Sequence, residues 1–301
     1  MKRTLLLMLI LLSFFSLAQG TRIMYDYRFV SDLDKKDSAN IELMYLDIKK
    51  DGSNFYSRQK FVSDSTRDAY FQKQLSMGST NFNYTGNNTG KVGYSVTKTY
   101  PDFSTVLHTA IGDNRYSVKN ENPMNWKIFP DKKTISKFEV QKATLDFGGR
   151  TWTAWFTQEI PFQDGPYKFH GLPGLILEME DSTGTHLYKF AGSKKLDEVQ
   201  KPDKKDEIGS TKSGLVIKTF GMASGKEIAV SEDQFKKQWK EFKNDPVKNM
   251  RQILSQGNMK ITMNVDGKQL NDPSEMLHAM EKSQKENIRK DSNKIEPALY
   301  P

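Results

Sequence analysis

Residues 138–159 read FEVQKATLDFGGRTWTAWFTQE. Apolar and polar side chains alternate on both sides of Gly148-Gly149, which is typical of two strands that each turn one face to water. The two glycines accept the positive backbone angles of a tight turn. The stretch therefore predicts an antiparallel hairpin of Phe138 to Phe147 with Arg150 to Glu159.

The same rule predicts other strands along the chain. Ile23 to Val30 alternates in the same way and is expected to be the first strand. Two more hairpins are Ile41 to Ile48 with Ser53 to Val62, and Leu175 to Asp181 with Thr185 to Phe190. Short turns between successive strands favour an antiparallel meander. The expected fold is mainly β, a β-rich α+β chain with an antiparallel curved sheet or half-barrel and C-terminal helices.

Helical patterns appear mostly in the last third of the chain. A short helix is predicted over Ser65 to Met77. The C-terminal helices are expected to open at the capping box of Ser231, at Asp245-Pro246 and at Asp272-Pro273, with fraying over Glu281 to Lys294. We expect one domain, residues 19–301, whose helical part covers about 231–290.

The first residues have the form of a secretory signal peptide. Two basic residues precede the apolar run Leu5 to Leu17, and Ser16-Leu17-Ala18 matches a small-x-small cleavage site. We therefore expect residues 1–18 to be removed on export. The apolar run is too short for a transmembrane helix, and there is no cysteine to carry the lipid of a lipoprotein. The expected location is the periplasm or the medium.

Composition excludes several kinds of chemistry. The 301 residues include no cysteine, which removes disulfides, thiolate catalysis and thiolate metal sites. The net charge is +8, and loss of Lys2 and Arg3 with the signal peptide leaves +6. Lysines alternate with acidic residues along the chain, so we expect a solvated surface and no nucleic-acid partner.

A second distinctive stretch, residues 153–178, reads TAWFTQEIPFQDGPYKFHGLPGLILE. With Trp126, Lys142-Ala143 and Gly149-Arg150 upstream, it resembles the GLPGLI family of exported bacterial proteins, also described as a Porphyromonas-type family of unknown function. The resemblance implies a signal peptide, a Gram-negative envelope location and a largely β fold, and it implies no reaction. Val140 departs from the pattern, because similar chains often carry a cysteine there.

The hexapeptide Gly171 to Ile176 has a structural and a functional interpretation. Pro173-Gly174 is a turn dipeptide, and the apolar run Leu175 to Leu177 suits a buried strand, so the motif is expected to deliver a strand into the core. Special turns also carry binding sites. The candidate binding residues are Trp155, Gln163, Tyr167, His170, Gly171, Leu172, Pro173 and Gly174.

Trp152 and Trp155 are three positions apart, so on a strand at most one of them faces the core. A hydrolase hypothesis takes Glu159 or Asp164 as general base and His170 as acid or orienting group. The chain has no Gly-x-Ser-x-Gly, His-Glu-x-x-His or phosphate-loop motif. Its four histidines lack metal-ligand spacing, so we expect neither a metal nor a cofactor.

These observations leave more than one functional hypothesis. The first is a non-enzymatic envelope protein that binds an apolar or peptide-like ligand, or an outer-membrane partner, through the concave sheet and the loop from Gln163 to Gly174. The alternative is a periplasmic hydrolase that uses Glu159, Asp164 and His170. A third is an assembly protein that docks on a partner through a flat aromatic surface.

Overall fold

A computed structural model describes residues 20–78, 90–120, 122–196, 226–255, 263–265 and 268–301. The predicted signal peptide lies outside the described residues. Among the described residues, no helix has the length and apolar character needed to cross a membrane.

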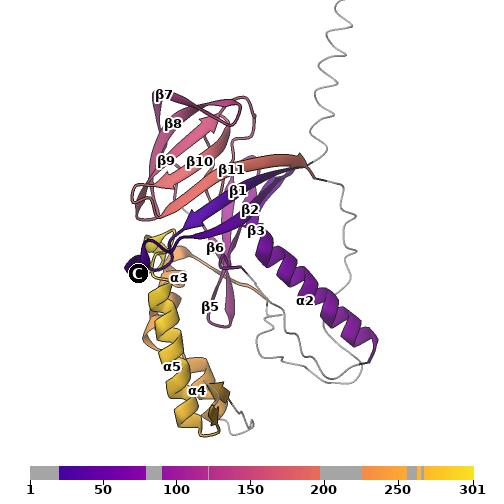
Figure 1. The fold of residues 1–301 in the computed structure, drawn as a ribbon, viewed down its shortest axis with the longest axis vertical. Coiled ribbons are helices and arrows are strands. Elements are labelled where there is room, and N and C mark those ends of the chain that lie inside the picture. Colours follow the sequence, from indigo (N-terminus) through magenta and orange to yellow (C-terminus); the bar gives the residue numbers. More distant parts are fainter. Residues whose placement is uncertain (1–19, 79–89, 121, 197–225, 256–262, 266–267) are drawn as a thin grey trace, which may run out of the picture.

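Twelve strands of the described chain form one open sheet, which dominates Figure 1. Its spatial order is β12-β6-β5-β4-β3-β2-β1-β11-β10-β9-β8-β7. Neighbouring strands are antiparallel, except that β12 is parallel to β6. The strands are β1 (Thr21–Phe29), β2 (Asn40–Ile48), β3 (Gly52–Ser57), β4 (Ser95–Thr99), β5 (Ser104–Ile111), β6 (Asn114–Lys119), β7 (Lys127–Ile135), β8 (Phe138–Phe147), β9 (Arg150–Thr157), β10 (Leu175–Asp181), β11 (His186–Lys195) and β12 (Ile228–Val230).

The predicted fold class, mainly β with helices toward the C-terminus, is confirmed. The three predicted hairpins are present as β2–β3, β8–β9 and β10–β11. In the β8–β9 turn, Phe147 pairs with Arg150, and Gly148 and Gly149 have φ values of 65° and 88°. Both values lie in the left-handed region that glycine enters without strain. The turn chemistry therefore fixes the register of the hairpin.

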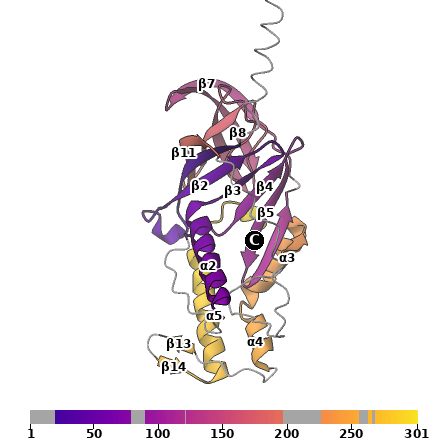
Figure 2. The ribbon, with the colours of Figure 1, turned by 90° about the vertical axis from the view of Figure 1, so that its right-hand side faces the viewer.

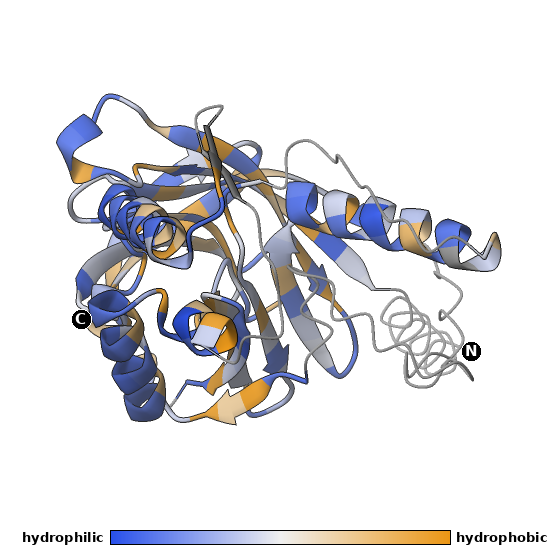
Figure 3. Ribbon diagram, turned by 90° about the horizontal axis from the view of Figure 1, so that it is seen from below, coloured by the Kyte–Doolittle hydropathy of each residue, from blue (hydrophilic) through white to orange (hydrophobic). Residues whose placement is uncertain are grey.

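One predicted strand is too long, because the chain becomes helical after Ser57. Helix α2 spans Arg58–Ser76, where the sequence predicted a strand to Val62 and a helix only from Ser65. The backbone N–H of Lys60 donates to Ser57 Oγ over 3.1 Å, which is an N-cap interaction. Figure 2 shows α2 extending away from the sheet, and Figure 3 shows hydrophilic and hydrophobic residues mixed along it.

The C-terminal helices follow the predicted order. Ser231 caps the first of them with the full capping box to Gln234. The second starts at Lys248, two residues after Pro246, and the third continues to Lys290 where fraying was predicted from Glu281. The remaining elements are α3 (Glu232–Asn244), α4 (Lys248–Ser255), α5 (Pro273–Lys290), the 3₁₀ turns η1 (Leu33–Lys35) and η2 (Pro297–Leu299), and a small hairpin of β13 (Met263–Val265) and β14 (Lys268–Leu270).

The extension of α5 has a local cause. Its exposed side carries ion pairs one helical turn apart, Lys285 with Glu281 at 2.6 Å and Lys290 with Glu286 at 3.2 Å. Its other side contributes Ile288, which packs against the core. The low apolar content of this stretch hid the contact of Ile288, and Arg289 also pairs with Asp34 at 2.6 Å.

The apolar face of the sheet is covered by the chain itself. Three segments supply buried residues to the same core as the strands: the β9–β10 loop (residues 158–174), helix α3 and the C-terminal segment (residues 292–301). Their buried apolar members are Tyr167, Phe169, Leu172, Phe235, Trp239, Ile295 and Leu299. These segments therefore pack on the apolar face of the sheet, where a ligand was expected.

Two glycines of the hexapeptide differ in what surrounds them. Gly174 has a φ of 148°, and a Cβ placed on it would overlap the carbonyl oxygen of Thr157. Gly171 has a φ of 89°, and a Cβ placed there would meet no atom within 4 Å. The first glycine is needed for close backbone packing, whereas the second is needed only for its backbone angle.

We therefore expect Gly174→Ala to lower the free energy of unfolding by about 3 kcal/mol or more. The matched variant Gly171→Ala should cost only about 1 kcal/mol, because it carries backbone strain alone. Urea unfolding of both variants measures the difference. Equal losses would show that the loop does not pack against β9 as described.

Candidate functional site

The β9–β10 loop is a closed and largely buried unit. Asp164 and His170 form a backbone β-bridge, and the N–H of Gly171 donates to the carbonyl of Gln163 over 2.9 Å. The next strand is tied in as well, because the N–H of Ile176 donates to the Asp164 carbonyl over 3.0 Å. These bonds hold the loop as a folded unit against the sheet.

Asp164 lies at the centre of a buried polar cluster. Its carboxylate forms an ion pair with Lys98 of β4, and the two side chains are 1% and 0% exposed. Its Oδ2 accepts hydrogen bonds from Ser53 Oγ at 2.6 Å and from the Tyr100 hydroxyl. Its Oδ1 accepts from the N–H of Gly165 at 2.7 Å. Both carboxylate oxygens are therefore occupied by donors from the protein.

The Lys98 ammonium donates to three acceptors at once. Besides Asp164, these are the carbonyls of Gly165 at 2.7 Å and Phe169 at 3.0 Å. Burial nevertheless lowers the pKa of Lys98, because desolvation penalises the charged form more than Asp164 favours it. The pair links β4 to the β9–β10 loop across the core.

A second buried pair joins this loop to the C-terminal segment. Lys168 Nζ lies 2.6 Å from Glu296 Oε1, and these side chains are 0% and 3% exposed. The Tyr167 hydroxyl donates to the same carboxylate oxygen. Burial raises the pKa of Tyr167, and the charge of Glu296 raises it further, so the phenol stays protonated.

His170 is half-buried beside the Asp164 cluster. Its ring stacks on Phe103 with centroids 4.7 Å apart, and its carbonyl accepts from Trp126 Nε1 at 2.8 Å. Its pKa is lowered to about 4, mainly by burial and then by the charge of Lys98. At neutral pH this imidazole is therefore uncharged.

The three residues of the hydrolase hypothesis are only partly brought together. Asp164 and His170 share a β-bridge, but the Asp164 carboxylate is bound to Lys98. Glu159 is exposed, and its carboxylate accepts from the backbone N–H of Glu139 over 2.9 Å. Among the described residues, no hydrogen bond joins Glu159 to either partner.

The predicted binding residues also divide between core and surface. Tyr167 and Leu172 are buried in the core, and Gly174 is buried against β9. Gln163, Gly171 and Pro173 are exposed. They form the outer rim of the loop.

The two tryptophans of β9 face opposite sides of the sheet, as predicted. Trp152 is fully buried, and its ring centroid lies 4.9 Å from that of Phe169. Trp155 is half-buried on the other face, where Lys133 Nζ lies 4.3 Å above its ring. The same lysine pairs with Glu178 at 2.6 Å. Neighbouring charged side chains therefore cover much of the outer tryptophan.

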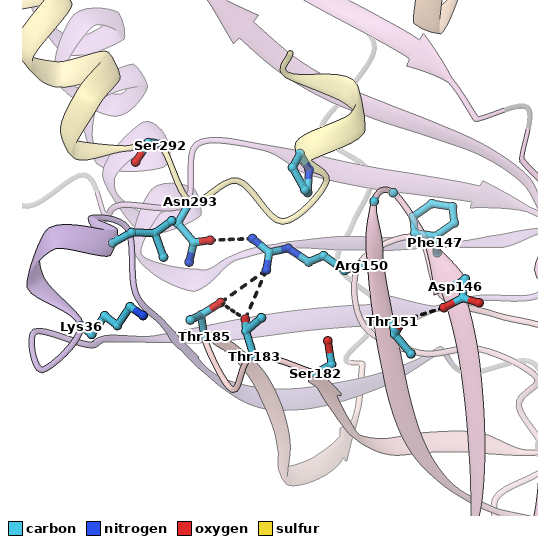
Figure 4. Close-up of a pocket in the computed structure, with 14 residues that line it drawn as sticks. Lys36, Asp146, Phe147, Arg150, Thr151, Ser182, Thr183, Thr185, Ser292 and Asn293 are labelled. Atoms are coloured by element: carbon cyan, nitrogen blue, oxygen red, sulfur yellow. Dashed lines mark hydrogen bonds between the residues drawn. The ribbon is translucent and has the colours of Figure 1, made fainter.

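Sequence reasoning did not predict the open pocket shown in Figure 4. It has a volume of about 850 Å³ and lies between the β8–β9 and β10–β11 turns, the C-terminal segment and η1. Most side chains at its edge are hydroxyls or charged groups. They include Lys36, Asp146, Thr151, Ser182, Thr183 and Ser292.

Arg150 anchors the walls of this pocket. Its guanidinium pairs with Asp181 at 2.8 Å and donates to Asn293 Oδ1 at 2.6 Å and to the Lys294 carbonyl at 2.7 Å. Figure 4 shows it pointing toward Asn293 and toward the hydroxyls of the β10–β11 turn. Arg150 thus ties two hairpins to the C-terminal segment. The position of Arg150 directly after the Gly148-Gly149 turn was the signal in the sequence that could have pointed to this residue.

Lys36 differs from Arg150 in its contacts. Its side chain is exposed and makes no hydrogen bond or ion pair with another described residue. In Figure 4 its side chain reaches from η1 along the pocket wall. Its ammonium is therefore available to an anionic group in the pocket.

Within the residues that the structure describes, no three histidine, aspartate or glutamate side chains gather as metal ligands would.

Comparison with known protein families matches the part of the chain that contains Arg150 and the β9–β10 loop. Residues 147–178 match the model of a family described as "Protein of unknown function (Porph_ging)". The match runs from the end of β8 through the β9–β10 loop into β10. No curated protein sequence matches the chain.

Two solved structures of PNGF-II are similar to part of this chain. The structure in space group C2 has 13% identity and a TM-score of 0.40, and covers 60% of this chain and 28% of that chain. The structure in space group P21 has 12% identity and a TM-score of 0.44, and covers 73% and 33%. The alignments thus span about a third or less of the PNGF-II chains.

His186 is 2% exposed and is linked to Arg150 through Asp181, whose Oδ1 accepts from the His186 backbone N–H over 2.8 Å. Its Nδ1 shares a hydrogen bond of 2.7 Å with the Tyr27 hydroxyl, whereas its buried Nε2 forms no hydrogen bond of ordinary geometry with the described residues. Its pKa is lowered to about 4, first by burial and then by the charge of Arg150. The folded protein therefore resists protonation of this ring.

This predicts a loss of stability in mild acid. Between pH 6.5 and about 4 the unfolded chain binds a proton at His186 that the folded chain does not, so the free energy of unfolding falls as pH falls. The contribution is up to about 1.4 kcal/mol per pH unit. Urea unfolding at several pH values should give a shallower slope for His186→Gln than for the unchanged chain. Identical slopes would contradict the assignment.

Proposed function

We propose that this chain is a non-enzymatic envelope protein of the GLPGLI type that binds a peptide-like ligand in the pocket between its hairpin turns and C-terminal segment. The observation that carries the proposal is that Arg150 holds the pocket wall in place while the Lys36 ammonium at the same pocket has no ion-pair partner among the described residues. Arg150 is fully used in holding the wall together, while Lys36 keeps its ammonium available.

The chemistry of the lining favours a peptide-like ligand over an apolar one. Hydroxyls of Thr151, Ser182 and Ser292 line the pocket together with the backbone of the Gly148-Gly149 turn. Such groups match the amides of a short peptide, and Lys36 matches a carboxylate. A volume of about 850 Å³ lies within the usual range for small-ligand sites.

The location expected from the sequence supports the same proposal. Residues 1–18 have the pattern of a cleaved signal peptide, so the ligand would be met in the periplasm or outside the cell. An outer-membrane protein with an exposed peptide segment is a ligand of this class. The net charge of +6 after cleavage favours acidic ligands at long range.

The alternative function, a hydrolase that uses Glu159, Asp164 and His170, has one observation in its favour, the β-bridge between the last two. It requires Asp164 to leave its buried pair with Lys98 before acting as a base. Removing one partner from such a pair costs about 3–5 kcal/mol. The binding proposal requires no such rearrangement.

The pocket is tested with a pool of short peptides that have free C-termini. The protein should retain peptides in equilibrium dialysis followed by mass spectrometry. Ser182→Trp, an exposed position in the β10–β11 turn, should reduce retention at least about tenfold by filling the pocket. The matched variant Ser182→Ala should reduce retention much less than Ser182→Trp, because it removes one hydroxyl and leaves the space open.

The same experiment separates the two functions. Peptides that stay intact and bind less well to Lys36→Gln would support the binding site. Peptides that are cleaved by the unchanged chain but not by His170→Ala would favour the hydrolase. Equal retention by the unchanged chain and Ser182→Trp would contradict the pocket.

A further inference from the structure

The buried pair of Lys98 and Asp164 combines a nucleophile with an acyl group in a site closed to water. The two side chains are in direct contact and are 0% and 1% exposed. An amine is a competent nucleophile when it loses its proton, and desolvation favours the uncharged form of Lys98. Burial lowers the pKa of Lys98 accordingly.

We propose that Lys98 and Asp164 condense to an amide cross-link between β4 and the β9–β10 loop. The bond that forms joins Lys98 Nζ to Asp164 Cγ, and the bond that breaks joins Cγ to Oδ2. The product is a secondary amide and one water molecule. The proposal is independent of the ligand proposed for the pocket.

The ion pair already contains every atom that the reaction needs. The ammonium carries three protons: two leave with Oδ2 as water, and one stays on the amide nitrogen. No oxidant, reductant or activated co-reactant is required. The remaining amide N–H keeps an acceptor, because the carbonyls of Gly165 and Phe169 lie at 2.7 and 3.0 Å from Nζ.

Each carboxylate oxygen is held by donors suited to its part in the reaction. The N–H of Gly165 donates to Oδ1 over 2.7 Å, where negative charge develops during attack. Ser53 Oγ and the Tyr100 hydroxyl donate to Oδ2, so they are placed to pass protons to the departing oxygen. Burial raises the pKa of Tyr100, and the negative charge of Asp164 raises it further, which keeps the phenol protonated.

The other buried pairs lack this arrangement. Lys168 contacts Glu296, but the only hydrogen-bond donor to that carboxylate among the described residues is the Tyr167 hydroxyl. Arg150 pairs with Asp181, but a guanidinium keeps its proton and does not act as a nucleophile. We therefore assign the cross-link to Lys98 and Asp164 alone.

A cross-link here would serve a chain that has no cysteine. Exported proteins commonly restrict their unfolded state with disulfides, which this sequence cannot form. The amide would close a loop between residues 98 and 164. It would restrict the unfolded chain in the same way, and reductants would not break it.

The test is high-resolution mass spectrometry of the denatured intact protein, expressed without residues 1–18. The measured mass should be lower than the sequence mass by one water molecule. Tryptic digestion should yield residues 92–115 joined to residues 151–168, because the modified Lys98 is no longer cleaved. The variant Lys98→Arg should show the full mass.

Asp164-Gly165 can also lose water by closing a cyclic imide on its own backbone, and the digest distinguishes this outcome. An imide leaves the two peptides separate and persists in Lys98→Arg. The full sequence mass in the unchanged chain, an imide at Asp164, or a link that maps to Lys168 and Glu296 would each overturn the proposal. The decisive measurement uses the unchanged chain, so it does not depend on a variant that folds.

Discussion

A broad open sheet must cover its apolar face, and this requirement organises the rest of the molecule. Within the described residues, the cover comes from the β9–β10 loop, α3 and the C-terminal segment. Each is irregular or short, so its backbone polar groups need partners of their own. The β-bridge between Asp164 and His170 and the caps of α3 supply them. The motif region is therefore first a part of the core.

Buried charges then fix how these covering segments are placed. Lys98 holds the β9–β10 loop to β4, Lys168 holds it to the C-terminal segment, and Arg150 holds that segment to two hairpins. A buried ion pair adds little net stability compared with apolar packing, but breaking one is costly. Such pairs specify one arrangement over others. The pocket follows from it, because its walls are the hairpins and tail that Arg150 joins.

The sequence predicted the parts of this structure that depend on local chemistry. Alternation and glycine turns located the hairpins, and the capping box located the start of α3. Contacts between residues far apart in the sequence had no local signal. Glu296 contacts Lys168 across the core, although the two residues are 128 positions apart in the sequence (296 − 168). Lys98 gave a weak clue, because it shares a strand face with the buried Val96. Alternation of apolar and polar residues shows which face of β4 is buried, but it does not show that Asp164 is the carboxylate that pairs with Lys98.

The β9–β10 loop belongs to the cooperative core of the protein. Native-state hydrogen exchange tests it most directly, because the backbone N–H groups of Phe169, Gly171 and Ile176 all donate inside the protein. We expect these amides to exchange only through global unfolding, with the same denaturant dependence as amides in the centre of β1. Exchange of the loop amides through a smaller local opening, while β1 stays protected, would contradict it and make the loop a detachable lid.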